Sequence, residues 1–112
     1  MKINIVGSGS IGSSFMSASL IIDDHILVDA PNGIIKYLKH LEYDILKIDT
    51  IIITHLHGDH FFDLPFLMLD KYFNHDKTLI KVICPYGTTK KIQKLFRLGF
   101  PNDFRKVIEN IN

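Results

Sequence analysis

The sequence predicts one α/β unit with a mixed sheet and flanking helices. Two observations support this fold class. Short β-branched runs dominate residues 2–28, as in antiparallel strands, and helical and strand-like patterns alternate after them. The 112 residues also contain no internal repeat, low-complexity segment or linker that would separate two domains. We therefore expect residues 1–112 to form a single domain.

The first predicted element is a strand over residues 2–6, which alternate in character and are rich in isoleucine. The run Gly7-Ser8-Gly9-Ser10 then predicts a glycine loop. A dinucleotide-binding loop would require a third glycine that opens a helix. Because residues 15–22 favour a second strand instead, we interpret the glycines as turn-forming residues.

A hairpin and a helix are expected next. Asp23-Asp24 predicts a turn into a strand over residues 26–28, which ends at Asp29. After Pro31-Asn32-Gly33 the pattern predicts an amphipathic surface helix with Asn32 as its N-terminal cap. Its apolar face comprises Ile34, Leu38 and Leu41, and its polar face comprises Lys36, Lys39 and His40.

The middle of the chain predicts two buried elements. Thr50 to Thr54 contains Ile51-Ile52-Ile53, whose continuous β-branched character predicts a strand covered on both faces. Residues 61–73 are apolar around nearly the whole helical circumference. This pattern predicts a buried helix that Pro65 starts or interrupts.

A strand and a helix complete the prediction. Residues 79–84 favour a strand, and Pro85-Tyr86-Gly87 separates it from a helix over residues 88–98. This helix is stopped by Gly99 and Pro101. The side chains expected to face inward are Ile92, Leu95 and Phe96.

Composition and charge exclude several classes of protein. Hydrophobic residues make up 46% and charged residues 22% of the chain, which is typical of a folded globular protein. A net charge of +1 gives no long-range attraction for nucleic acid or an anionic membrane. The single cysteine, Cys84, cannot form an intrachain disulfide, and no stretch has the apolar character of a signal peptide or a membrane span. We expect a cytoplasmic protein that does not contact membranes.

The most informative motif is a histidine cluster directly after the isoleucine-rich strand. It places His55, His57, Asp59 and His60 within six residues. Imidazole and carboxylate groups bind zinc, iron and manganese, and the cluster lacks the thiolates of a structural zinc site. We expect His55 and His57 to share one ion, and Asp59 and His60 to face a second, with Gly58 allowing the tight loop. The alternative is a solvated polar loop.

The run from Ile52 to His60 resembles the metallo-β-lactamase superfamily, in which a strand ending in Thr-His is followed by His-x-Asp-His and a helix. The strand that ends at Asp29 also resembles that family's strand ending in a buried aspartate. The resemblance implies the first half of a metallo-β-lactamase-like αββα sandwich and two divalent metal ions, zinc first, with manganese or iron as alternatives. It further implies that Asp29 braces the metal site through hydrogen bonds, and that Asp59 binds metal and orients the attacking hydroxide.

Within that superfamily the chain is similar to the ribonuclease Z-like phosphodiesterase branch. Leu64-Pro65 after the metal loop and the stretch from Val82 to Gly87 carry this similarity. Asp63 and Phe66 stand where that branch favours glycine, and Pro31-Asn32-Gly33 differs from the glycine-containing turn that usually follows the buried aspartate.

The resemblance covers only the first part of the family's fold. Family members add a third histidine for the first ion, a bridging aspartate and a final histidine in their second half. After His60 this chain has only His75, which we interpret as part of a polar turn that ends a helix. We therefore expect a metal-dependent, phosphodiesterase-like hydrolase with an incomplete dinuclear-type site, and a poor enzyme when isolated. The alternative is a non-catalytic metal-binding or interaction module derived from the same fold.

Two further expectations concern partners. Because the missing half would leave apolar surface uncovered, we expect a homo-oligomer or a complementing second chain. The substrate would be a small-molecule or nucleic-acid phosphodiester. A basic helix face followed by two more cations could contact nucleic acid phosphates, although a solvated helix face is the preferred interpretation. These residues are Lys90, Lys91, Lys94, Arg97, Arg105 and Lys106.

Overall fold

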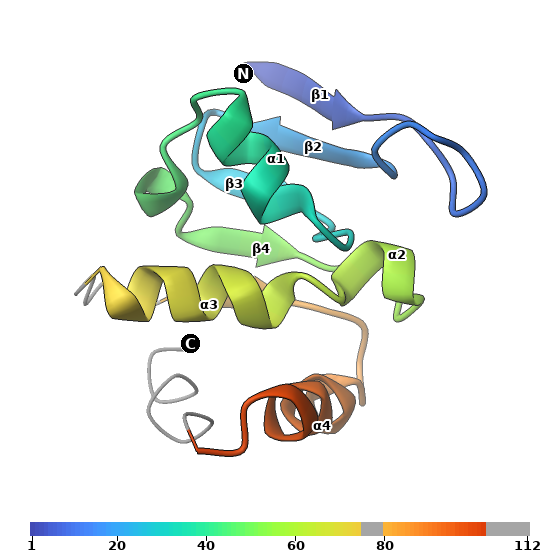
Figure 1. Ribbon diagram of the computed structural model, residues 1–112, viewed down its shortest axis with the longest axis vertical. Helices are drawn as coiled ribbons and strands as arrows, with labels where there is room; N and C mark the ends of the chain where they lie inside the picture. The colour runs from blue at the N-terminus through green and yellow to red at the C-terminus, as the bar shows by residue number, and fades with distance from the viewer. Residues whose placement is uncertain (75–79, 103–112) are drawn as a thin grey trace.

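The computed structural model describes residues 1–74 and 80–102 and contains a five-stranded mixed sheet (Figure 1). The strands are β1 (Ile3–Gly7), β2 (Ser19–Ile22), β3 (Ile26–Val28), β4 (Thr50–Ile52) and β5 (Lys81–Ile83). They lie in sequence order across the sheet. β1, β2 and β3 pair antiparallel, whereas β3, β4 and β5 pair parallel. The mixed sheet predicted from the sequence is therefore confirmed.

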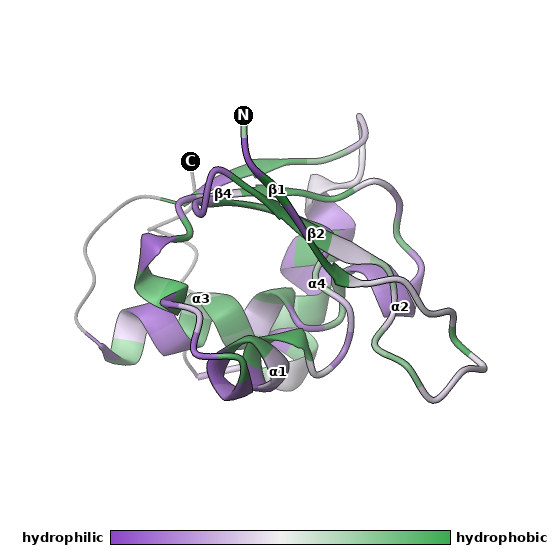
Figure 2. Ribbon diagram, turned by 90° about the horizontal axis from the view of Figure 1, so that it is seen from above, coloured by the Kyte–Doolittle hydropathy of each residue, from purple (hydrophilic) through white to green (hydrophobic). Residues whose placement is uncertain are grey.

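Four α-helices and one short 3₁₀ helix complete the described elements. They are α1 (Ile34–His40), η1 (Ile45–Lys47), α2 (Gly58–Phe61), α3 (Leu64–Phe73) and α4 (Thr89–Gly99). Figure 2 shows α1, α3 and α4 on one side of the sheet. The core between the sheet and these helices includes Ile21, Leu27, Ile51, Ile34, Leu38, Leu67 and Phe96.

The side of the sheet away from the helices is also aliphatic. The pairing register places its side chains in two rows across the strands, because alternate residues of a strand point to opposite faces. We call this surface the open sheet face. Thr50 and Lys81 complete one of its rows, and its aliphatic residues are Ile3, Ile5, Leu20, Ile22, Ile26, Val28, Ile52 and Ile83. Ile5 at the β1 edge is 73% exposed and Ile83 at the β5 edge is 43% exposed. Within the described residues, β4 is therefore covered on one face, where two covered faces were expected.

The predicted second strand is shorter than expected. β2 begins at Ser19, and residues 8–18 form a loop that extends away from the sheet (Figure 1). Local hydrogen bonds hold this loop: the Gly9 amide donates to the Met16 carbonyl at 2.8 Å, and the Ser13 hydroxyl accepts from the Phe15 amide at 3.2 Å. Serine side chains that bond nearby backbone compete with strand pairing, which explains the difference.

The helix predicted over residues 61–73 begins later, as α3 at Leu64, and Phe61 ends the preceding short helix α2. Pro65 lies in the first turn of α3, where its missing N–H costs nothing, so it starts this helix. The expectation of complete burial is wrong, because Phe62 and Phe66 are 49% and 53% exposed. Lys71, in contrast, is buried, and its Nζ donates to the carbonyls of Leu46 and Ile48 at 3.0 and 2.6 Å. This lysine joins α3 to η1 and to the start of β4.

The N-terminal cap predicted for α1 is also wrong. The cap position is Gly33, which has a φ of 84°, and Asn32 is exposed before it. The buried carboxylate of Asp63 instead accepts hydrogen bonds from the Gly33 and Ile35 amides at 2.9 and 2.8 Å. A residue distant in sequence thus satisfies amides that lack partners within the helix.

His25 and Asp49 connect the β2–β3 turn to the start of β4. His25 Nδ1 lies 2.8 Å from Asp49 Oδ1, and this hydrogen bond lowers the pKa of Asp49 below its ordinary 3.8. Because the folded pKa is the lower one, the carboxylate adds stability that is present above its unfolded pKa and is lost as pH falls through the folded pKa. We expect Asp49→Asn to lower the free energy of unfolding near neutral pH by less than about 1 kcal/mol, as for other exposed pairs.

Urea unfolding of both proteins at neutral pH and well below the ordinary pKa of Asp49 checks this prediction. The difference between wild type and Asp49→Asn should shrink at the acidic pH, since both proteins then lack the charge. A difference that grows on acidification would contradict it.

Candidate metal centre

The histidine cluster lies where the two parallel strands β3 and β4 end. Asp29 directly follows β3, and Thr54 and His55 follow β4. Parallel neighbours present their carboxyl ends at the same edge of a sheet, and open α/β sheets bind ligands at that edge. α2, which contains Asp59 and His60, lies beside this edge (Figure 1).

Asp29 occupies a backbone conformation that is unusual for a residue with a side chain. Its φ is 60°, in the left-handed region, and the residue is 5% exposed. Two contacts hold its backbone: the Asp29 amide donates to the Ile52 carbonyl at 2.7 Å, and the Ser19 hydroxyl donates to the Asp29 carbonyl at 3.0 Å. Such strained positions persist where the surroundings fix them, and they cluster at functional sites.

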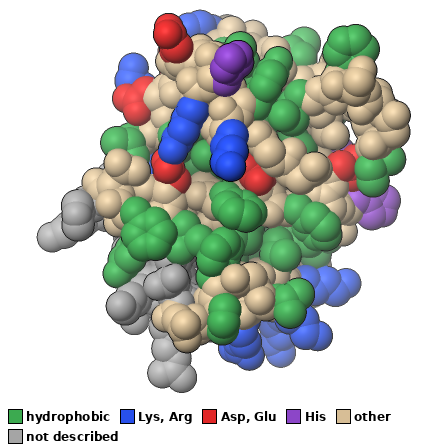
Figure 3. Space-filling view, viewed as in Figure 1, with side chains coloured by type: hydrophobic (Ala, Val, Ile, Leu, Met, Phe, Trp, Pro, Cys, Tyr) green, Lys and Arg blue, Asp and Glu red, His purple; other side chains and the backbone are tan. Residues whose placement is uncertain are grey.

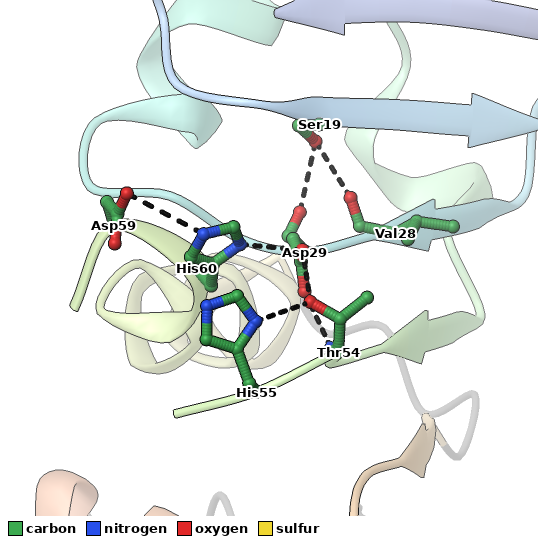
Figure 4. A network of polar contacts seen from close by, with 7 residues as sticks. All are labelled: Ser19, Val28, Asp29, Thr54, His55, Asp59 and His60. Atoms are coloured by element: carbon green, nitrogen blue, oxygen red, sulfur yellow. Dashed lines mark hydrogen bonds and ion pairs between the residues drawn. The ribbon is translucent and has the colours of Figure 1, made fainter. Parts of the chain in front are cut away.

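The Asp29 carboxylate connects both sides of the site (Figure 4). Its Oδ1 accepts from the Thr54 amide at 2.8 Å. Its Oδ2 lies 2.7 Å from the Thr54 hydroxyl and 2.8 Å from His60 Nδ1. Since an ionised carboxylate only accepts hydrogen bonds, a proton lies on His60 Nδ1, and in the neutral ring Nε2 keeps its lone pair.

His55 is oriented by the same carboxylate through Thr54. His55 Nδ1 lies 3.1 Å from the Thr54 hydroxyl oxygen, whose own proton is donated to Asp29. The hydroxyl oxygen therefore accepts from His55 Nδ1, which leaves the Nε2 of His55 with its lone pair as well. This arrangement, in which a second residue fixes the tautomer of a histidine, is typical of metal-ligating histidines.

The four residues predicted as ligands lie together. The His55 ring centroid is 4.6 Å from that of His57 and 3.9 Å from that of His60. His60 Nε2 is 3.6 Å from Asp59 Oδ2. Over residues 1–74 and 80–102, however, no group of three or more histidine, cysteine, aspartate or glutamate side chains is arranged to hold one ion. Metal binding by these residues stays a prediction.

The donor chemistry of the cluster fits a divalent cation. His60 Nε2 and Asp59 Oδ2 face one another at 3.6 Å, and with a neutral His60 ring both atoms carry lone pairs. Two ligand atoms that are each about 2.1 Å from a tetrahedral zinc ion lie about 3.4 Å apart. The observed separation is thus close to that of two atoms sharing an ion, and a cation between them would offset their repulsion.

Gly58 has a different role from the one expected. Its φ lies outside the left-handed region, so the loop does not need the conformational freedom of glycine. A Cβ at this position would lie 2.6 Å from the Phe62 ring. Glycine at this position therefore leaves room for the Phe62 ring, which a larger residue would displace.

Two residues of the site were missed from the sequence. Thr54 orients His55, and Ser19 holds the Asp29 backbone. Thr54 directly precedes the histidines, so its position was a usable signal. Ser19 is brought to the site only by pairing of β2 with β3, which no local pattern indicates.

The predicted basic surface is partly described. The space-filling view shows Lys and Arg side chains gathered over α4 (Figure 3). Lys90, Lys91, Lys94 and Arg97 are exposed there. His75, Arg105 and Lys106 lie outside the described residues. Contact with nucleic acid stays a prediction, and no helix within the described ranges has the length and apolar character to cross a membrane.

Comparisons with known proteins agree with this geometry. The chain is 32% identical over 105 residues to ribonuclease Z of Methanococcus maripaludis, covering 89% of this chain and 34% of the relative. It is 39% identical over 75 residues to ribonuclease Z of Staphylococcus haemolyticus, covering 65% and 24%. The crystal structure of the short form of human tRNase Z superimposes with a TM-score of 0.73 and 28% identity, covering 88% of this chain and 40% of that one.

A more distant structure shares the fold alone. The metallo-beta-lactamase fold protein YhfI from Bacillus subtilis gives a TM-score of 0.62 at 20% identity, over 82% of this chain and 41% of that one. The sheet and the comparisons thus show the first part of a metallo-β-lactamase fold, as the sequence predicted, in a chain that is similar in sequence to ribonuclease Z. The profile of the family described as anti-Pycsar protein Apyc1 matches residues 1–105, and the chain belongs to that family. It spans about a third of the length of the ribonuclease Z relative.

Proposed function

We propose that this chain supplies the first part of a dinuclear metal site in a hydrolase that acts on phosphodiesters. The observation that carries the proposal is the Asp29 network, which in the neutral rings leaves Nε2 of His55 and His60 as acceptors, with that of His60 beside Asp59. The ribonuclease Z relatives support a small-molecule or nucleic-acid phosphodiester as substrate. Zinc is the proposed metal because the donor set consists of imidazoles and carboxylate.

Each residue has a proposed task. His55 and His57 would hold one ion, and Asp59 and His60 the second. Bound divalent cations lower the pKa of water from about 15.7 toward 7, which makes hydroxide available at neutral pH. Asp59 would accept a hydrogen bond from the attacking water and so orient it toward phosphorus. Asp29 would keep His60 in the tautomer that ligation requires.

The site requires more ligands than the described part of the chain brings together. We propose that residues 1–112 form one partial domain, which a further polypeptide surface or a second copy completes. The open sheet face supports this proposal, since a second layer would cover it. The chain's 40% share of the tRNase Z chain also supports it. A cytoplasmic location stays a prediction that rests on the lone Cys84.

A chelator-sensitive assay on a generic phosphodiester, bis(p-nitrophenyl) phosphate, tests the proposed activity. We expect slow turnover that EDTA abolishes and zinc restores. His57→Ala should lower this turnover at least about tenfold, because removal of a ligand weakens binding of the ion. His40→Ala is the matched control, since His40 is exposed on α1 outside the cluster.

The second candidate is a non-catalytic metal-binding or interaction module. It is favoured by the absence of a complete ligand set among the described residues. Zinc bound at the cluster without turnover in wild type would support the module. Elemental analysis that finds no zinc, iron or manganese in the purified protein would contradict the hydrolase and the metal-binding module, and would leave an interaction module.

A further inference from the structure

The Asp63 carboxylate is buried between α1 and the start of α3. Asp63 is 6% exposed, and each of its oxygens accepts one backbone hydrogen bond. Oδ1 accepts from the Gly33 amide at 2.9 Å, and Oδ2 accepts from the Ile35 amide at 2.8 Å. Because these amides lie at the N-terminal end of α1, the carboxylate fixes the turn that joins Asp29 to this helix.

The backbone of the same turn is bonded to the metal loop. The Ala30 amide donates to the His60 carbonyl at 2.7 Å, and the Asp63 amide donates to the Ala30 carbonyl at 3.0 Å. Asp63 therefore holds the turn by its side chain and by its backbone, and His60 contacts the residue next to Asp29. The turn is thus held by hydrogen bonds to Asp63 and to the His60 carbonyl.

We infer that Asp63 is a positioning residue for the Asp29–His60 pair. Asp29 has a left-handed φ of 60°, so its orientation depends on the constraint of the following residues. Movement of the Ala30 backbone would shift the Asp29 carboxylate and the His60 backbone. It would thereby change the hydrogen bond between Asp29 and His60 Nδ1. The positioning effect is a property of the metal-free protein; its consequence for zinc rests on the proposed function.

The contact joins two departures from the ribonuclease Z-like pattern. Asp63 stands where that branch favours glycine, and Pro31-Asn32-Gly33 replaces its usual turn after the aspartate. In this structure the two altered segments are in direct hydrogen-bond contact. A glycine at position 63 would leave two amides without their acceptor, and a buried amide without a partner is costly. In this structure the N-terminal end of α1 therefore depends on Asp63 for these acceptors.

Nuclear magnetic resonance of the histidine side chains, with zinc removed, tests the inference. At mildly alkaline pH, ¹H–¹⁵N spectra distinguish rings protonated on Nδ1 from rings protonated on Nε2. We expect His60 to be protonated on Nδ1 in wild type. Asp63→Gly should lose this preference and give a mixture of tautomers, and Asp63→Asn, which retains one acceptor oxygen, should lie between them.

Asp70→Asn is the matched control. Asp70 is a second carboxylate on α3, and it bonds the Lys39 side chain at the surface. This variant should keep the wild-type His60 tautomer. Zinc titration should then show at least tenfold weaker binding in Asp63→Gly than in Asp70→Asn, in line with the effect of residues that orient metal ligands.

The outcomes separate the inference from the proposed function. Wild-type protein with the Nδ1 tautomer but no zinc binding would contradict the proposed function. The positioning effect of Asp63 would then be decided by comparing the His60 tautomer in wild type and Asp63→Gly. A folded Asp63→Gly with an unchanged His60 tautomer would overturn the inference. If neither Asp63 variant folds, amide hydrogen exchange in wild type decides: slow exchange at Gly33 and Ile35 supports the anchor, and fast exchange overturns it.

Discussion

Replacement of Asp29 by asparagine is expected to weaken zinc binding by about 10- to 100-fold. The carboxylate accepts from the Thr54 amide, the Thr54 hydroxyl and His60 Nδ1. An asparagine side chain has a single acceptor oxygen and an NH₂ group that only donates, so it cannot accept from all three donors. His55 and His60 would then lose the constraint that presents their Nε2 atoms. Titration of zinc against a competing chelator measures the change.

This substitution tests the role of the carboxylate without disturbing the backbone conformation of residue 29. Asparagine tolerates the left-handed region well, so the φ of 60° at this position is not a reason for misfolding. Asp24 offers a matched control because it also has a positive φ, of 64°, and its side chain pairs with the exposed Lys2, away from the histidine cluster. If Asp29→Asn and Asp24→Asn bind zinc equally tightly, Asp29 does not brace the site.

The predictable part of this fold is local. The β-branched runs located all five strands to within a few residues, because alternation and branching are properties of neighbouring residues. The cluster from His55 to His60 was found for the same reason, since its members are adjacent in sequence. Asp29 was located by the strand that it ends.

The unpredicted features are pairings between distant residues. Asp63 replaces Asn32 as the acceptor at the start of α1, and no pattern near Asn32 indicates an acceptor thirty residues away. Ser19 reaches Asp29 only through the register of β2 and β3. Lys71 is a charged helix residue, and such residues are usually exposed. In this structure it is buried, and its Nζ donates to two backbone carbonyls. Propensity could not anticipate these contacts because tertiary structure creates them.

The burial of the strand faces was also only partly predictable from the sequence. An apolar pattern on both faces of a strand shows that both faces must be shielded from water. It does not show which face is shielded by helices of the same chain. The helices cover the face that contains Leu27 and Ile51 (Figure 2). The open sheet face remains, and we expect it to determine how the chain behaves in solution.

Self-association through the open sheet face is therefore expected in the isolated chain. Full burial of an aliphatic side chain contributes about 1.5–3 kcal/mol. Burial of this face against a second layer would then offset the roughly 4–15 kcal/mol cost of association. Sedimentation of the wild-type chain should give a mass above the 12.9 kDa of a monomer. The double variant Leu20→Lys with Ile26→Lys, which places two charges on central strands, should sediment as a monomer.

Phe66→Lys provides the control for this comparison, because Phe66 is 53% exposed on the helical side of the molecule. It removes an exposed apolar group and adds one lysine charge, against two in the double variant, but it leaves the sheet unchanged. If the sheet drives association, Phe66→Lys should keep the wild-type mass. A monomeric wild type at micromolar concentration, or equal dissociation by Phe66→Lys, would show that the open sheet face needs no partner. The site would then have to obtain its missing ligands without assembly on that face.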